Sequence, residues 1–239
     1  MSHKQPPHGL TKFDRFIKEC LHGADEMEYL PPTFGRLGSR NPITGLDLDE
    51  VIKRFSKALH TLSSDEIKEG TAPAGQTFFG QFIDHDITLD VTSQIGRLID
   101  PAKVRNFRTP SLDLDNVYGS GPEASPHLYS KKHGEYLYIG TPDNPWDVAR
   151  NWEDRAVIGD PRNDENGLVS QIQSHFIQFA NIAHHLAAKD PALFAHTRAL
   201  CTPQETQTAF EASRMMVRWH YQWLVMHDFL PSFVDPAVV

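Results

Sequence analysis

The sequence predicts a mainly α fold with long loops between the helices and little β structure. From Gly167 to Ala188, apolar residues recur every three or four positions, which is typical of a long amphipathic helix. Its apolar face would consist of Leu168, Ile172, Phe176, Phe179, Ala183 and Leu186. A second helical pattern runs from Pro203 to Leu230, and Pro231 is expected to end it. The chain shows no alternation of strand and helix patterns and no internal repeat.

Composition places the chain among globular proteins and narrows its partners. Of its 239 residues, 39% are hydrophobic and 23% are charged, which excludes general disorder. The net charge is −8 and there is no basic stripe, so we expect no nucleic-acid partner. No apolar run approaches the roughly 20 residues of a membrane span. The opening MSHKQPPHGL lacks the apolar core of a signal peptide, so a cytoplasmic location is the default expectation, with other export routes left open.

The N-terminal half predicts two further helices and several loops. Residues 1–30 should form a polar arm with a short helix over Thr11–His22, and residues 31–239 should form the main unit. A helix is expected over Asp49–Leu62, where acidic residues suit its N-terminus. Between Gly121 and Trp146, scattered Gly and Pro predict a surface loop with room for one hairpin.

The segment TFFGQFIDHDITLD, residues 77–90, carries the most unusual pattern in the chain. Read as a helix, it places Phe78, Gln81, Phe82 and His85 on one face. A buried amide and a buried imidazole need hydrogen-bond partners. A lone histidine of this kind is usually a satisfied core residue. Here acidic residues flank His85 on both sides, which favours a functional site.

Two loops supply further candidate residues. Oxygen-bearing side chains alternate at Thr109, Ser111, Asp113 and Asp115, so an extended segment would turn them to one side and offer the hard ligands that calcium prefers. The spacing does not match an EF-hand, and the segment alone favours a solvated acidic loop. In GDPRNDE, residues 159–165, Arg162 is either a fixed cation for an anionic ligand or an ordinary surface arginine.

Taken together, these segments resemble the animal-type haem peroxidase superfamily, in particular its bacterial members. The resemblance is carried by GQFIDHDIT, TPSLDLDNVYGSGP, RAVIGDPRNDEN and RWHYQWLVMHDFLP, which stand in the family's order and span much of residues 75–232. It implies a helical fold of the haem peroxidase type, with residues 31–239 forming the distal portion, and haem b as cofactor. Residues 1–70 contribute little to it.

The resemblance also implies roles for individual residues. His85 matches the distal histidine that acts as acid and base on hydrogen peroxide, and Arg162 matches the arginine that stabilises cleavage of the O–O bond. Gln81 matches the glutamine of the same cavity. Asp84 and Glu165 match acids that form ester bonds to haem in animal members, and whether they do so here is left open. The implied calcium ligands are Asp86, Thr109, Ser111 through its backbone carbonyl, Asp113 and Asp115.

The implied activity is peroxide-dependent oxidation of a small donor, whose identity as a halide, phenol or lipid is left open. Two alternatives remain: a fatty-acid dioxygenase of the same superfamily, and a non-catalytic protein that binds calcium or haem. The family's proximal histidine motif has no match before Val239. We therefore expect a second polypeptide to carry it; truncation before that half, or loss of catalysis, would also account for its absence.

Overall fold

A computed structural model describes residues 45, 47–61, 70, 72–90, 100, 104–201, 208–235 and 237–238. These residues form helices joined by long loops, and among them there is no strand, which confirms the mainly α prediction. In chain order the elements are α2 (Leu48–Thr61), α3 (Ala74–Ile87), α4 (Asp115–Tyr118), η2 (Pro126–Leu128), η3 (Pro161–Asp164), α5 (Gly167–Lys189), η4 (Pro191–Phe194), α6 (Ala195–Leu200), α7 (Ala209–Leu224), η6 (Val225–Phe229) and α8 (Leu230–Phe233). The expected N-terminal arm and the helix over Thr11–His22 lie outside the described residues.

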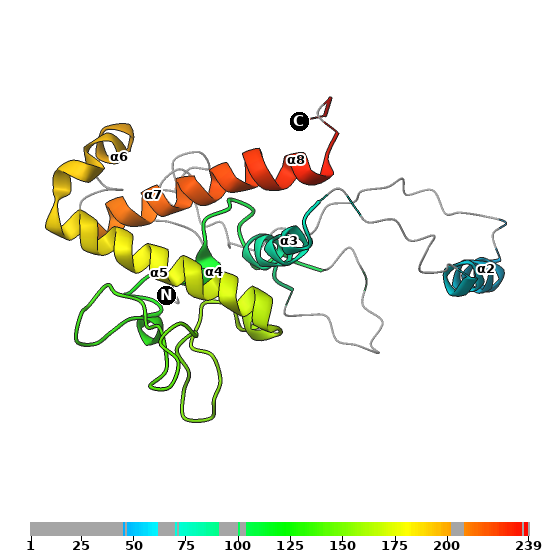
Figure 1. The fold of residues 1–239 in the computed structure, drawn as a ribbon, viewed down its shortest axis with the longest axis horizontal. Helices are drawn as coiled ribbons and strands as arrows, with labels where there is room; N and C mark the ends of the chain where they lie inside the picture. The colour runs from blue at the N-terminus through cyan, green and yellow to red at the C-terminus, as the bar shows by residue number, and fades with distance from the viewer. Residues whose placement is uncertain are drawn as a thin grey trace.

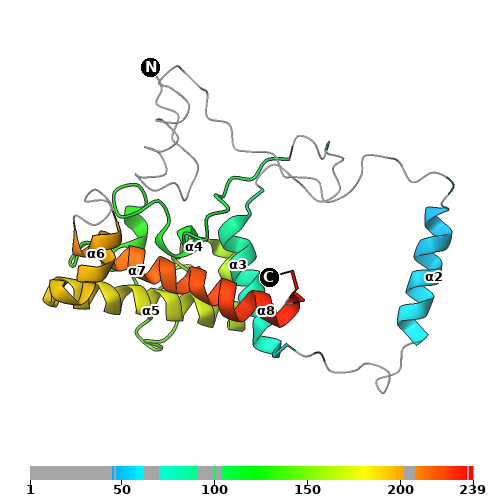
Figure 2. The ribbon, with the colours of Figure 1, turned by 90° about the horizontal axis from the view of Figure 1, so that it is seen from above.

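The long helices α5 and α7 lie side by side and form the frame of the molecule (Figure 1). Side-chain caps define where each begins. The Asn166 side chain accepts hydrogen bonds from the first amides of α5, and Thr208 and Glu211 form a reciprocal capping box at the start of α7. From a second direction, α3 is seen to run across the frame beside α8 (Figure 2).

The helical segment that contains α7 continues beyond the end predicted from the sequence. Instead of stopping before Pro231, the chain passes through the π-helical turn η6 and adds a last turn, α8, with Pro231 in its first positions. Pro231 lies just after the π-helical turn, where the regular i to i−4 bonding of the α-helix is already interrupted, so its missing amide removes no regular α-helical bond there. The predicted start at Pro203 lies outside the described residues.

The predicted apolar face of α5 is confirmed in part, because Ala183 is buried and Ile172, Phe176 and Phe179 pack against the core. Leu168 and Leu186 are exposed, and the buried side includes Ser170, Gln173 and Ser174. These polar side chains are buried because the facing segments are loops, whose backbone groups need hydrogen-bond partners. Accordingly, the Ser174 hydroxyl donates to the Trp146 carbonyl at 2.5 Å.

The segment between α4 and η3 has many exposed residues, as predicted for a surface loop, and its antiparallel bridge between Tyr129 and Leu137 matches the hairpin that the prediction allowed. It contains isolated antiparallel bridges, Tyr129 with Leu137 and Ile139 with Val148, and these four residues belong to the core or pack against it. The Asn181 side chain on α5 both accepts from and donates to the backbone of Leu137, at 2.9 Å each.

Helix α2 confirms the helix predicted over residues 49–62. It stands apart from the other helices in both views, and none of its residues is buried (Figures 1 and 2). No helix in the described part of the chain has the length and apolar character required to cross a membrane.

Candidate functional site

Aromatic packing fixes α3, the helix that carries most of the candidate residues. Phe82 is fully buried and stacks on Phe176 of α5 with a ring-centroid distance of 4.9 Å. Gly80 lies close to Phe229, so that a Cβ atom at this position would stand 3.0 Å from the Phe229 ring. Burying two aromatic rings contributes on the order of 2–3 kcal/mol each from area alone. The register of α3 is thereby set, and His85 and Asp86 are turned into the protein.

His85 is buried and its ring is held from one side. Its Nδ1 atom lies 2.7 Å from the side-chain oxygen of Asn163 in η3. One turn earlier, the Gln81 amide donates to Glu165 at 3.1 Å and its oxygen accepts from Asn166 at 3.3 Å. The expected i, i+4 relation of Gln81 and His85 thus exists on α3, and both side chains meet the segment that contains Arg162.

Arg162 lies beside the C-terminal end of α3. Its Nη2 atom donates to the carbonyls of His85 and Thr88 at 3.0 and 2.6 Å, and its Nε and Nη2 atoms donate to Asp160 at 3.0 and 2.7 Å. Burial alone would raise the pKa of Asp160, but hydrogen bonds from Arg162 and Arg108 outweigh burial and hold that pKa below its usual value. The ionised Asp160 therefore fixes the guanidinium of Arg162 next to the turn that carries His85.

The two acids that the family resemblance connects with haem esters are both exposed. Asp84 accepts a hydrogen bond from the Thr88 hydroxyl at 3.1 Å, while Glu165 accepts from Gln81. The structure therefore brings Glu165 next to Gln81 and leaves Asp84 on the outer side of the same helix. Both remain accessible to a ligand bound beside α3.

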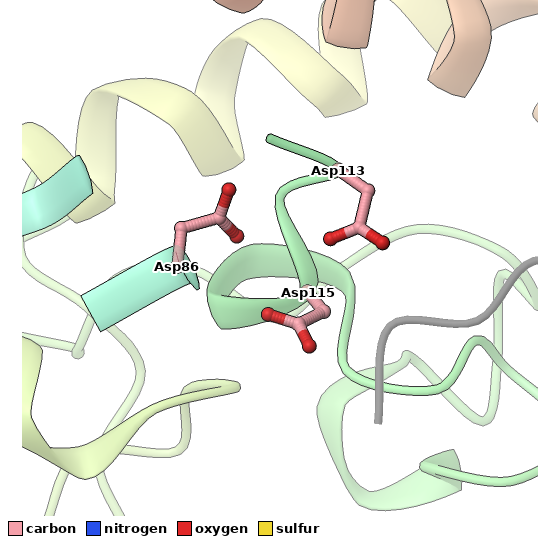
Figure 3. A group of neighbouring side chains, drawn as sticks. All are labelled: Asp86, Asp113 and Asp115. Carbon is pink, nitrogen blue, oxygen red and sulfur yellow. The ribbon is translucent and has the colours of Figure 1, made fainter. Parts of the chain in front are cut away.

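A buried cluster of carboxylates also lies at the C-terminal end of α3. Asp86, Asp113 and Asp115 are buried, and one oxygen from each lies within 4.8 Å of the others. Figure 3 shows the three side chains gathered between the end of α3 and the start of α4. Asp115 pairs with Arg108 at 2.9 Å, and Arg108 also pairs with Asp160 at 2.6 Å. Arg108 therefore connects the carboxylate cluster to the residue that holds Arg162.

The loop that carries Asp113 and Asp115 is tightly turned rather than extended. Leu112 and Leu114 have φ angles of 52° and 60°, in the left-handed region that residues with a Cβ rarely adopt. These two turns place both aspartates inside, so the solvated-loop alternative is wrong. Thr109 is buried and donates to Asp113 at 2.8 Å. Ser111 is exposed, and its carbonyl accepts from Gln222 at 3.1 Å, so it lies at the rim of the cluster.

The charge state of the cluster reflects its burial. Burial raises the pKa of Asp86, against hydrogen bonds that lower it. Burial also raises the pKa of Asp115 to about 9; Arg108 opposes this effect, and the neighbouring Asp113 and Asp86 add to it. Without a cation, burial therefore favours the protonated forms of Asp86 and Asp115.

These residues fit a calcium ion. Asp86 Oδ1 and Asp115 Oδ1 are buried and accept no hydrogen bond from the described residues. An unsatisfied buried carboxylate oxygen is costly, and coordination to a hard cation removes that cost. The ligand atoms come from α3 and from the α4 loop, so a bound ion would join these two elements.

Four buried polar residues at this site were not identified from the sequence: Arg108, Asn116, Asn163 and Gln173. Asn163 stands next to Arg162 in sequence, which is the single local feature that pointed to it. Gln173 interrupts the apolar pattern of α5 without an adjacent motif. Their importance follows from contacts between segments that are distant in sequence.

No protein-family model matches the chain, and no curated protein sequence matches it. The fold is similar to the crystal structure of fatty acid alpha-dioxygenase from Arabidopsis thaliana, with a TM-score of 0.48 and 18% sequence identity. The similarity covers 69% of this chain and 29% of that chain.

Proposed function

We propose that this chain forms the peroxide-binding side of a haem-dependent peroxidase of the animal-type superfamily. The observation that carries the proposal is the meeting of α3 with η3 and the start of α5. Residues about 80 positions apart in sequence, Gln81 with Glu165 and His85 with Asn163, hydrogen-bond there, and Arg162 binds the His85 carbonyl. The motifs that resemble the family in the sequence are the same segments that meet in space.

Each of these residues has a physical role in the proposed reaction. Because Nδ1 of His85 is bound by Asn163, Nε2 is the ring nitrogen left to take a proton from one peroxide oxygen and return it to the other. Arg162 is a cation held in place by Asp160, and it would stabilise the negative charge that develops as the O–O bond breaks. Gln81 would hydrogen-bond to the bound peroxide or to water beside it.

Haem, when bound, supplies the redox chemistry of the reaction, and this chain supplies position, protons and charge. The residues that would contact it are Gln81, Asp84, His85, Arg162 and Glu165. Asp84 and Glu165 are exposed on the two segments that meet at His85, so both carboxylates are open to a ligand bound beside α3. Ester bonds from these two acids are part of the proposal.

Calcium would serve the site by fixing α3. Asp86 follows His85 directly, whereas Asp113 and Asp115 belong to the α4 loop. An ion bound among them would restrain the last turn of α3 through Asp86. Calcium would then fix the backbone at His85 through the neighbouring Asp86, while Asn163 holds the His85 ring.

A second polypeptide, or a further part of a longer chain, would supply the proximal histidine of the iron. Within the described residues the other buried histidine is His184, near the far end of α5, where it pairs with Glu135 at 3.5 Å. Leu168, Ile182 and Leu186 on α5 and Trp223 on α7 are exposed apolar side chains. They support the proposal because a partner that completes the haem site would cover surfaces of this kind.

The proposal is tested on protein isolated with its natural partners. We expect an absorbance band of bound haem to co-elute with this chain, intact-mass analysis to find a second polypeptide or a longer chain, and hydrogen peroxide to oxidise a phenolic donor. Oxygen uptake with a fatty acid, without donor oxidation, would assign a dioxygenase instead. Isolated material that stays free of haem after titration with haemin would refute a haem enzyme of either kind.

A further inference from the structure

A line of hydrogen bonds runs through the core from His85 to the backbone of α4. The oxygen of the Asn163 side chain lies 2.7 Å from His85 Nδ1, and the Asn163 amide nitrogen donates to the oxygen of Gln173 at 2.8 Å. The Gln173 nitrogen in turn donates to the backbone carbonyl of Asn116 at 3.1 Å. The side chains of Asn163, Gln173 and Asn116 are fully buried, so water does not replace any of these partners.

The last bond in this line fixes the direction of all the others. A backbone carbonyl can only accept a hydrogen bond, so Gln173 must turn its NH2 group toward Asn116. Its oxygen then faces Asn163, which must supply its own NH2 group. The Asn163 oxygen is consequently the atom that faces His85, and an oxygen acceptor requires a hydrogen on Nδ1. The orientation of both amides thus follows from the chemistry of one carbonyl.

Asn116 is itself held in place. Its side-chain nitrogen donates to the carbonyl of Phe82 at 3.2 Å, one turn before His85 on α3. Asn116 therefore ties α4 to the same helix that carries the histidine. The line of bonds starts and ends on α3, with η3, α5 and α4 between, and forms a closed loop of four elements.

We propose that Asn163 and Gln173 are positioning residues that hold neutral His85 in the tautomer with hydrogen on Nδ1, leaving the lone pair on Nε2. The opposite tautomer would set the lone pair of Nδ1 against the oxygen of Asn163 and lose the buried bond. This inference rests on the proposed function, because an Nε2 lone pair is what a general base needs to accept the proton of peroxide. The inference adds Asn163 and Gln173 to the proposed site as the residues that keep this lone pair on Nε2.

The tautomer is measurable without haem. We would label the histidines of the full chain with 15N, keep calcium in the buffer, and record nitrogen spectra at a pH where histidine is neutral, assigning His85 by its absence in His85→Ala. The protonated and unprotonated ring nitrogens differ strongly in chemical shift. Free neutral histidine favours hydrogen on Nε2, so the expected Nδ1–H form would differ from the default.

Matched variants separate this role from simple packing. Asn163→Leu and Gln173→Leu preserve size and remove the bonds, and we expect both to move His85 toward the Nε2–H form. Asn163→Asp keeps an oxygen acceptor beside Nδ1 although it can no longer donate to the Gln173 oxygen, and it should retain the hydrogen on Nδ1 of His85. Folding of each variant is checked by circular dichroism, and Asn163→Asp serves as the informative variant if the leucine variants do not fold. In the complete haem protein, Gln173→Leu should slow the reaction with peroxide on the order of 10-fold or more, because a misdirected tautomer disables a histidine base.

Two results would overturn the inference: wild-type His85 with its hydrogen on Nε2, or an unchanged Nδ1–H form in a folded Asn163→Leu variant. Loss of Nδ1–H in Asn163→Asp would also contradict it, since the acceptor is still present. These outcomes are independent of the proposed function. If the chain shows the Nδ1–H form but never binds haem, the positioning role of Asn163 and Gln173 would stand and the proposed enzyme function would be refuted.

Discussion

His85 is the residue whose proposed role can be tested most directly. It is buried, one ring nitrogen is bound, and it lies next to a fixed cation. In the complete haem protein, we expect His85→Ala to slow the reaction with hydrogen peroxide by about 10²–10⁴-fold while haem stays bound, because a positioned general base contributes about that much. Stopped-flow absorbance measures the rate. His127→Ala, at an exposed histidine, is the control and should react normally. A His85→Ala protein of wild-type speed would disprove the assignment.

Arg162 combines a proposed catalytic charge with a structural task. Its guanidinium contacts both oxygens of Asp160 and two carbonyls at the end of α3, a geometry that a lysine ammonium cannot reproduce. We therefore expect Arg162→Lys to lower the free energy of unfolding by about 1–3 kcal/mol, from the loss of charge-assisted hydrogen bonds. Urea denaturation measures this change. Arg155→Lys, at an arginine whose side chain is 80% exposed, should leave stability unaltered, and equal effects of the two variants would argue against the structural task.

The difference between His85 and its partners shows what a sequence reveals at this scale. Gln81 and His85 lie one helical turn apart, so a local period was enough to pair them. Asn163 and Gln173 act through bonds that join residues 78 and 10 positions apart, and no period relates them. Amides are also common at surfaces. Only packing shows that these two are buried and satisfied by each other.

At the scale of elements, the sequence predicted helices well and their faces less well. The bounds of α5 agree closely with the predicted range of 167–188. Part of its buried side was misjudged because hydrophobic periodicity assumes apolar neighbours, whereas α5 packs not only against α7 but also against the backbone carbonyls of Asn116 and Trp146. The 109–115 segment was misjudged for a related reason: left-handed turns at Leu112 and Leu114 are not favoured by those residue types locally. Tertiary contacts must stabilise them.

Gly159 controls how closely the segment before η3 approaches α4. A Cβ atom at this position would stand 2.5 Å from the Asn116 carbonyl oxygen and 2.6 Å from that of Asp115. Because both contacts are backbone atoms, Gly159→Ala must push α4 away, and we expect a destabilisation of about 1–3 kcal/mol. Calcium affinity should fall with it, as measured by calorimetry. Gly167→Ala, with open space at its Cβ position, is the control. If Gly159→Ala bound calcium as tightly as the wild type, the position of α4 would not determine calcium affinity.

At the scale of the whole molecule, the two halves of the site share one charge network. Arg108 pairs with Asp115 in the carboxylate cluster and with Asp160, which holds Arg162. Three successive ion pairs, Asp115 with Arg108, Arg108 with Asp160 and Asp160 with Arg162, therefore connect the cluster to the cation proposed to act on peroxide. Removing calcium should therefore affect more than the carboxylate cluster, because the charges of Asp86 and Asp115 interact with Arg108. Sequence motifs identified the two ends of this network, Asp115 and Arg162, but not the buried Arg108 between them.

Calcium and pH should consequently act together on the stability of the whole chain. Burial raises the pKa of Asp115 to about 9 and also raises the pKa of Asp86. Without calcium, the folded state therefore keeps protons on these groups that the unfolded state releases above about pH 4. This stabilisation is complete below the unfolded pKa and is lost as pH rises toward about 9. Calcium needs ionised ligands, so its own stabilisation grows over the same interval.

Thermal unfolding of the chain with excess calcium and after its removal, at pH 5, 7 and 8.5, tests this coupling. We expect the difference in Tm between the two conditions to widen as pH rises, because the calcium-free protein weakens while the calcium-bound protein does not. In Asp115→Asn the calcium-free protein should lose much of this pH dependence, since the amide does not titrate. Asp154→Asn, at an aspartate whose side chain is 90% exposed, should behave as wild type. A calcium effect that stays constant or shrinks with pH would show that Asp86, Asp113 and Asp115 do not bind the ion.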